Sequence, residues 1–135
     1  MEYLEKVKEL SNRDEKFVKA ASDQNTTYTF IIEPEPEKGI NERIVIGYRI
    51  ENGKITEVWR GERKTEFVIS GKYGVWVDIL TGKYSAVRAL LTRKLKASGN
   101  KLKLMRYAKA TERWIEILKT IPTEFHGEYA DRSIK

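Results

Sequence analysis

The stretch that decides the fold is RIVIGYRIENGKITEVWR, residues 43–60. In its first half, apolar and polar side chains alternate, which is the period of a half-buried β-strand. Asn52-Gly53 then separates this run from a second strand-like run, and Asn-Gly between two such runs is the strongest short-range hairpin signal. The segment therefore predicts two antiparallel strands that turn one face toward a core.

Two further strand-like runs flank this hairpin. Residues 26–33 and 63–70 are rich in β-branched and aromatic side chains. Gly61-Glu62 separates the hairpin from the later run, so the four runs are expected to form a meander. The connection at residues 33–39 holds two prolines and three glutamates. Proline cannot donate a ladder hydrogen bond, so this connection is expected to be an exposed acidic loop.

Helical periodicity fills the two ends of the chain. Residues 2–22 predict an amphipathic helix, and a polar Asp14 in its apolar stripe allows a break near Ser11-Asn12. In the second half, a short helix is expected over 73–80, ending at Gly82, and Ser85 is expected to cap a second short helix. An edge strand at 94–97 and one long helix over 101–121 are expected to follow. Strands followed by segregated helices predict an α+β fold, with helices on one face of a largely antiparallel sheet.

Length and composition limit the classes of protein to consider. The 135 residues suit a single domain, 1–135. There is no cysteine and only one histidine, His126, which excludes disulfides, thiolate metal sites and a cysteine nucleophile. No apolar run is long enough to span a bilayer, and no signal-peptide pattern begins the chain. These features predict a cytoplasmic protein without a metal or cofactor, with a composition that resembles thermophile usage.

The positive charge is concentrated in one part of the sequence. The net charge is +6, and residues 83–119 alone carry eleven basic and two acidic side chains. Such a basic stretch favours phosphate groups, on nucleic acid or on an anionic lipid surface, or is simply a solvated face. Arg106, Lys109 and Arg113 share one face of the expected long helix, and are candidates for a membrane or phosphate contact.

Residues that could carry out chemistry are scarce. None of the common nucleophile, phosphate-loop or metal-site motifs is present. Asp78 lies in an apolar segment, either at a pocket mouth or, as we favour, on the exposed side of a helix. The strand runs carry aromatic side chains that could stack on bases, but the basic cluster belongs to the helical half, so nucleic-acid binding is not favoured. The aromatic residues in question are Tyr28, Phe30, Tyr48, Trp59 and Phe67.

Residues 71–122 resemble the sterol carrier protein type 2 family of lipid-binding domains. The resemblance rests on four features: the apolar helix Tyr73-Gly74-Val75-Trp76-Val77-Asp78-Ile79-Leu80, the pair Gly82-Lys83, the strand Lys94-Leu95-Lys96 after a short helix, and Gly99-Asn100 opening the last helix. The chain departs from the family pattern at Thr92-Arg93 and at Tyr84-Ser85-Ala86. The resemblance implies a five-stranded sheet with helices on one face, enclosing a hydrophobic tunnel for sterols, fatty acids or fatty acyl-CoA.

We therefore hypothesise non-catalytic binding or transfer of a lipid, either one of these or an isoprenoid-like molecule. Two alternatives stay open: a basic interaction module with a filled cavity, which would bind nucleic acid or protein, and an accessory domain of an enzyme. The oligomeric state is not predicted. The expected ligand-binding wall consists of Phe30, Ile46, Tyr48, Phe67, Trp76, Ile79, Leu80, Leu91, Met105, Ala108, Ile115 and Leu118.

Overall fold

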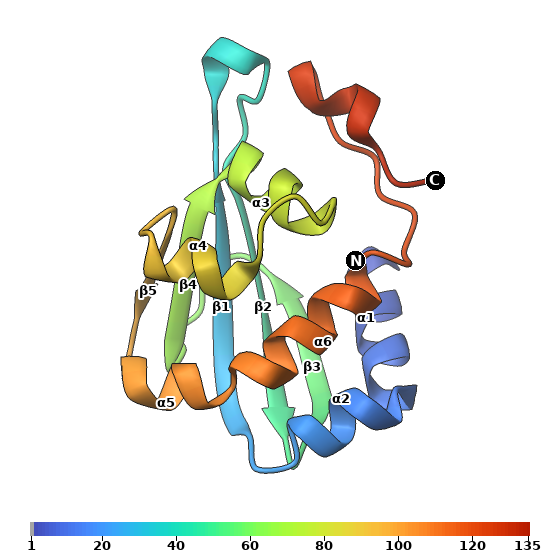
Figure 1. The fold of residues 1–135 in the computed structure, drawn as a ribbon, viewed down its shortest axis with the longest axis vertical. Coiled ribbons are helices and arrows are strands. Elements are labelled where there is room, and N and C mark those ends of the chain that lie inside the picture. The colour runs from blue at the N-terminus through green and yellow to red at the C-terminus, as the bar shows by residue number, and fades with distance from the viewer. Residues whose placement is uncertain (1) are drawn as a thin grey trace.

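The structure is a computed structural model that describes residues 2–135 (Figure 1). The strands are β1 Asn25–Glu33, β2 Ile44–Glu51, β3 Lys54–Arg60, β4 Phe67–Lys72 and β5 Leu95–Ser98. The α-helices are α1 Glu2–Arg13, α2 Glu15–Ala20, α3 Tyr73–Leu80, α4 Ala86–Leu91, α5 Lys101–Arg106 and α6 Ala108–Leu118. Two 3₁₀ segments complete the chain, η1 Pro36–Lys38 and η2 Gly127–Arg132.

The strands form one sheet in the order β3-β2-β1-β4-β5. Every neighbouring pair is antiparallel except β1 and β4, which run parallel. In Figure 1, α6 crosses in front of the sheet, and α1 and α2 lie on the same side near β3. The expected α+β class, with helices on one face of a largely antiparallel five-stranded sheet, is confirmed.

The hairpin predicted from residues 43–60 is present as β2 and β3. Asn52 and Gly53 both have positive φ, 50° and 83°, as a type I′ turn requires. A register shift between Arg49 and Ile50 lets Ile50 pair with Ile55, and both side chains are almost completely buried. The Asn12 side chain bonds the backbone N–H and C=O of Ile55 at 2.7 and 2.8 Å, which fixes the end of α1 to β3.

The expected four-stranded meander is wrong at its last step. β4 does not pair with β3; it pairs with β1, and residues 61–66 cross the face of the sheet opposite the helices to reach it. Threonines on that face of β1 hold the crossing segment. Thr29 Oγ1 lies 2.7 Å from Thr65 Oγ1, and Thr27 Oγ1 accepts the Glu66 N–H at 2.9 Å. The residues of a turn do not show with which strand of the sheet the next strand will pair.

Both long helices expected from the periodicity are interrupted. The first divides at Asp14, two residues beyond the expected break, because the Asp14 carboxylate caps α2 by accepting the Phe17 N–H at 2.8 Å. The last divides at Tyr107, whose N–H bonds the carbonyl of Leu104, three residues back, and whose ring packs edge-on against Phe67 at 6.4 Å. Asp14 interrupts the apolar stripe of the first helix, so the sequence signals that break. The stripe of the last helix continues through Tyr107, so periodicity alone does not show the second break.

The acidic loop is not fully exposed as expected. Glu35 is buried, and its Oε1 accepts the Gly74 N–H at the start of α3 at 2.7 Å. The C-terminal segment packs against this loop, where an ideal Cβ on Gly39 would lie only 3.1 Å from Gly127 Cα. Gly39 and Gly127 both have positive φ, so a side chain at either position would be strained as well as crowded.

The aromatic side chains of the strands do not form an exposed stacking platform. Tyr28, Phe30, Tyr48 and Phe67 are buried on the helix-facing side of the sheet. Trp59 is buried on the opposite side, beneath the guanidinium of Arg63, whose Cζ lies 4.3 Å from its ring centroid. The core thus takes up the rings that could have stacked on bases.

Candidate functional site

An internal cavity of about 110 Å³ lies between the helix-facing side of the sheet and helices α1, α3 and α6. Strands β1, β2 and β3 form its floor. Its lining side chains are almost all apolar: Tyr3, Leu4, Val7, Phe30, Ile32, Ile46, Gly47, Tyr48, Val58, Trp76, Leu80, Trp114, Ile115 and Leu118.

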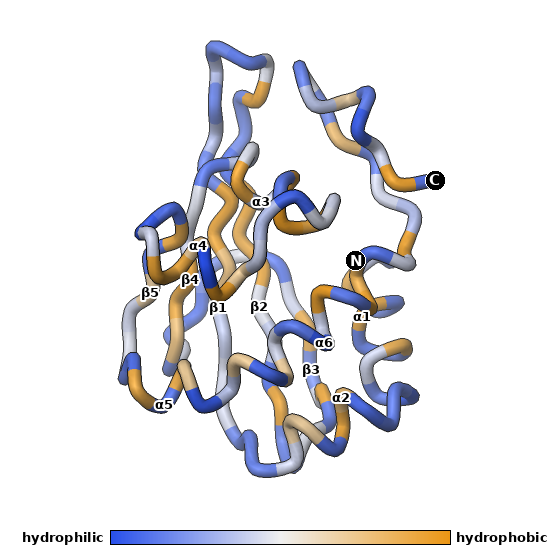
Figure 2. The backbone as a smooth tube through the Cα atoms, viewed as in Figure 1, coloured by the Kyte–Doolittle hydropathy of each residue, from blue (hydrophilic) through white to orange (hydrophobic). Residues whose placement is uncertain are grey.

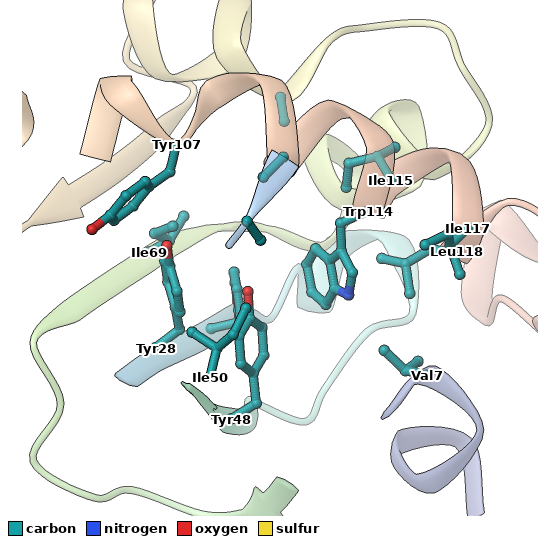
Figure 3. Close-up of a cluster of buried hydrophobic side chains, with 14 of the residues drawn as sticks. Val7, Tyr28, Tyr48, Ile50, Ile69, Tyr107, Trp114, Ile115, Ile117 and Leu118 are labelled. Atoms are coloured by element: carbon teal, nitrogen blue, oxygen red, sulfur yellow. The ribbon is translucent and has the colours of Figure 1, made fainter. Parts of the chain in front are cut away.

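Stacked aromatic rings form the centre of this cavity wall. The Trp114 indole of α6 lies 5.3 Å from the Phe30 ring and 5.4 Å from the Tyr48 ring, measured between centroids. Trp76 of α3 meets Phe30 edge-on at 6.0 Å, and its Nε1 donates to the carbonyl of Ile31 at 3.2 Å. Figure 3 shows Trp114 opposite Tyr48, with Ile115 and Leu118 on the same helix. These contacts hold the wall in a defined shape.

The cavity wall carries no ionised side chain. Its polar groups are the tyrosine hydroxyls and the two indole N–H groups, and the N–H of Trp114 is buried without a hydrogen-bond partner among residues 2–135. Burial raises the pKa of the Tyr48 hydroxyl, and burial also raises that of Tyr3. Both hydroxyls are therefore neutral near pH 7. Such a wall suits an uncharged, apolar occupant.

A cleft of about 320 Å³ adjoins the cavity and opens toward the surface. Six residues line both spaces: Tyr3, Leu4, Ile32, Ile46, Trp76 and Leu80. The outer wall of the cleft is formed by Tyr73, Val77, Ile44 and the segment 122–126. Three exposed polar side chains, Arg60, Glu124 and His126, also line it. The apolar interior thus leads to a cleft with charged groups along its wall.

The structure brings together seven of the twelve residues expected in the ligand-binding wall. These seven line the cavity: Phe30, Ile46, Tyr48, Trp76, Leu80, Ile115 and Leu118. That they contact a ligand stays a prediction.

The other five lie outside the cavity. Phe67 is fully buried between the rings of Tyr28 and Tyr107, and Ala108 is half-buried at the start of α6. Ile79 is buried on α3 and lines a groove beside α6 instead of the cavity. Leu91 and Met105 line a surface groove next to β5. The break at Tyr107 and the placement of α4 beside the edge strand explain why this last pair is displaced.

Seven cavity residues were not among those expected: Tyr3, Leu4, Val7, Ile32, Gly47, Val58 and Trp114. Tyr3, Leu4 and Val7 lie on the apolar side of the amphipathic first helix, a pattern that predicts burial but not a cavity. These side chains become part of a cavity wall only because α1 packs beside the sheet. Trp114 lies beside the apolar stripe of the last helix, and its large indole is the signal in the sequence that could have identified it.

The three basic residues expected to share a helix face have different surroundings. Arg106 lies on α5 and Lys109 on α6, and both are exposed. Arg113 is engaged in a two-pronged ion pair with Asp14, at 3.0 Å from Nε and 2.6 Å from Nη2. Asp14 neutralises this guanidinium, so the three residues do not form one free basic stripe.

The remaining titratable candidates lie at the surface. Asp78 lines neither the cavity nor the cleft and forms an ion pair with Arg132 at 2.9 Å. His126 is exposed on the cleft wall, and its backbone N–H donates to the Tyr73 hydroxyl at 3.0 Å. Across residues 2–135, no three carboxylate or imidazole groups gather in a way that could hold a metal ion. No helix in the same range is long and apolar enough to cross a membrane.

Several solved structures share this fold. The crystal structure of sterol carrier protein 2 has a TM-score of 0.81 at 21% identity, over 89% of this chain and 95% of that one. A conserved hypothetical protein from Thermus thermophilus, described as possibly sterol carrier protein, has a TM-score of 0.78 at 21% identity, over 87% of this chain and 85% of that one. Apo sterol carrier protein 2 from Yarrowia lipolytica has a TM-score of 0.60 at 15% identity, over 87% and 89%. A search of curated protein sequences found no match.

The fold and the site define a class of small α+β domains with an apolar cavity between a mixed sheet and its helices. The model of the SCP-2 sterol transfer family matches residues 4–112. This chain therefore belongs to that family, as the resemblance of its sequence implied.

Proposed function

We propose that this chain binds a lipid and carries it between membranes, with the apolar body of the lipid in the cavity and its polar end in the cleft. The observation that carries the proposal is the shared boundary of the two spaces. Six residues line both the cavity and the cleft. They form an apolar passage from the cavity, which contains Trp114 in its wall, to the cleft, which is lined by Arg60 and His126. This arrangement, with an apolar space that leads to a polar one, matches a lipid with an apolar chain and a polar end.

The size of the cavity favours a single-chain ligand. An apolar cavity of roughly 150 Å³ binds a molecule the size of benzene, so 110 Å³ accepts the end of an acyl or isoprenoid chain. Most of a longer chain would then lie in the cleft, whose 320 Å³ falls within the roughly 300–1,000 Å³ of small-molecule sites. A rigid sterol nucleus would require the side chains of the wall to move apart. We therefore rank fatty acids and fatty acyl-CoA above sterols.

The chemistry of the wall supports binding rather than turnover. Neutral tyrosines and indoles surround the space that would hold the lipid, and charged side chains are among the lining residues of the cleft but not of the cavity. The gain on binding would come from removal of apolar surface from water, at about 25 cal/mol per Å² before the costs of association. Arg60, exposed on the cleft wall, is suited to the carboxylate of a fatty acid.

The proposal is tested by purifying the chain without denaturation, extracting it with organic solvent and identifying the extract by mass spectrometry. We expect a fatty acid or other single-chain lipid in stoichiometric amount. Protein that emerges empty is then titrated with a long-chain fatty acid while tryptophan emission is followed. A chain that carries no lipid and takes up none would contradict the proposal and favour the interaction-module alternative.

A further inference from the structure

A second surface, remote from the cavity, exposes apolar side chains to solvent. Leu91, Leu102 and Met105 are the exposed large hydrophobic residues among residues 2–135, with 69%, 83% and 37% of their surface accessible. Single exposed leucines are ordinary, but exposed apolar side chains on neighbouring elements are a feature of interaction surfaces. No other part of residues 2–135 covers these three side chains.

These three side chains lie on two short helices that flank the edge strand β5. Leu91 ends α4, and Leu102 and Met105 stand three positions apart on α5, so they share a helix side. Leu91 and Met105 line a shallow groove of about 520 Å³, whose floor includes Leu95 of β5. In Figure 2, orange hydrophobic positions in α4, β5 and α5 are interleaved with blue hydrophilic ones.

The part of the sequence that contains these apolar residues is rich in basic residues and has no acidic ones. Residues 79–111 contain nine lysines and arginines and no aspartate or glutamate. Arg93, Lys96 and Lys101 line the groove itself. Among the nine, Lys103 is the one with an ion-pair partner in the described part of the chain, Glu66 at 2.6 Å. The others leave a positive field around the exposed leucines.

We propose that this surface docks the protein on an anionic lipid bilayer. The docking patch consists of the apolar tips Leu91, Leu102 and Met105 and the cations Lys96 and Lys101. Aliphatic tips partition into the boundary between headgroups and acyl chains, while lysines beside them attract acidic headgroups. Nucleic acid offers phosphates but no place for three aliphatic side chains, and binding of unpaired bases uses aromatic platforms. The patch offers no exposed ring for that purpose.

The docking patch is independent of the lipid site. The groove beside β5 shares no lining residue with the cavity or with the cleft. Membrane attachment and ligand uptake can therefore be lost separately. The patch also replaces the basic stripe expected from sequence, because Arg113 of that stripe is paired with Asp14.

The test is co-sedimentation with vesicles of phosphatidylcholine alone and of phosphatidylcholine mixed with phosphatidylglycerol. Wild-type protein should bind the mixed vesicles, and binding should weaken as salt rises. Each lysine near an anionic surface contributes about fivefold to binding, so K96Q/K101Q should bind about 25-fold more weakly. L91S/L102S should lose at least about tenfold, because two aliphatic tips no longer enter the bilayer.

A matched control is K6Q/K19Q, which removes two exposed lysines from α1 and α2 instead. It should bind vesicles nearly as well as the wild type, and all three variants should take up fatty acid from solution as before. Failure of the wild type to bind mixed vesicles, or equal losses in K6Q/K19Q and K96Q/K101Q, would overturn the docking proposal. So would retention on single-stranded DNA that exceeds vesicle binding and is unchanged in L91S/L102S. Fatty-acid uptake in these same proteins tests the lipid site separately, so failure of one proposal is distinguishable from failure of the other.

Discussion

The Tyr129 hydroxyl donates a hydrogen bond to Oε1 of Glu35 at 3.1 Å, although the two residues are 94 positions apart. The same oxygen accepts the backbone N–H of Gly74 at 2.7 Å. Only 7% of the Glu35 side chain is exposed. One carboxylate therefore ties together the loop after β1, the start of α3 and the C-terminal segment that carries η2.

This contact is expected to hold the outer wall of the cleft in place, because residues 122–126 precede η2 in the same segment. Y129F removes one hydrogen bond and should lower the free energy of unfolding by about 1 kcal/mol. E35A leaves both the Gly74 N–H and the Tyr129 hydroxyl without their acceptor, and should cost about 2–4 kcal/mol. Urea unfolding measures both values.

The matched control is E37A, since Glu37 is an exposed glutamate of the same loop. Its unfolding midpoint should stay close to that of the wild type. Hydrogen exchange adds a local readout: amides of residues 123–134 should exchange faster in E35A than in E37A. Equal stability of E35A and E37A would contradict the anchoring role of Glu35.

The ion pair between Asp14 and Arg113 predicts a dependence of stability on pH. The Arg113 guanidinium holds the pKa of the Asp14 carboxyl below its ordinary value of 3.8, helped by the Phe17 N–H. Because the folded-state pKa is lowered, this stabilisation is fully present above the unfolded pKa and is lost as pH falls through the folded one. D14N should therefore unfold more readily than the wild type at pH 7, with the difference shrinking below about pH 4.

The two functions of Asp14 can be separated by choice of variant. Asn is as good an N-cap as Asp, so D14N should lose the ion pair and keep the cap of α2. D14A loses both and should be less stable than D14N by about 1 kcal/mol. In urea midpoints measured between pH 3 and pH 7, D14N should lose the pH dependence that Asp14 contributes, whereas R113Q should keep the smaller part that comes from the Phe17 N–H. A constant gap between D14N and the wild type across that range would contradict the predicted linkage.

The three tryptophans should report differently on a bound lipid. Trp76 and Trp114 line the cavity, whereas Trp59 is buried on the opposite face of the sheet under Arg63. In a fatty-acid titration, W59F should keep the full change in emission, while W76F and W114F should each lose part of it. A response that disappears in W59F would place the ligand on the wrong side of the sheet.

The sequence predicted most of the secondary structure because each element follows local rules. Alternation in residues 43–60 and the Asn52-Gly53 turn specify the hairpin without help from the rest of the chain. The parallel pairing of β1 with β4 depends instead on contacts between Thr29 and the crossing segment 61–66, which no local pattern displays. The burial of Glu35 likewise depends on Tyr129, far away in the sequence.

The candidate site was predictable only in part for a similar reason. Helical and strand periods identify which side chains turn inward, and Phe30, Ile46 and Trp76 were found in that way. They do not tell a packed core from a cavity, because unfilled volume results from how whole elements meet. Leu91 was misplaced because a short apolar helix at the edge of a sheet has the same composition as one that covers its centre.

The central claim is that the cavity holds the apolar part of a lipid, and a matched pair of valines tests it most directly. Val58 is half-buried on β3 and lines the cavity, whereas Val68 is half-buried on β4, outside the cavity and the cleft. The account predicts that V58F lowers the affinity for a long-chain fatty acid at least about tenfold, because the added ring occupies the space, while V68F binds like the wild type. Affinity that is unchanged in V58F, with both variants folded by circular dichroism, would contradict it.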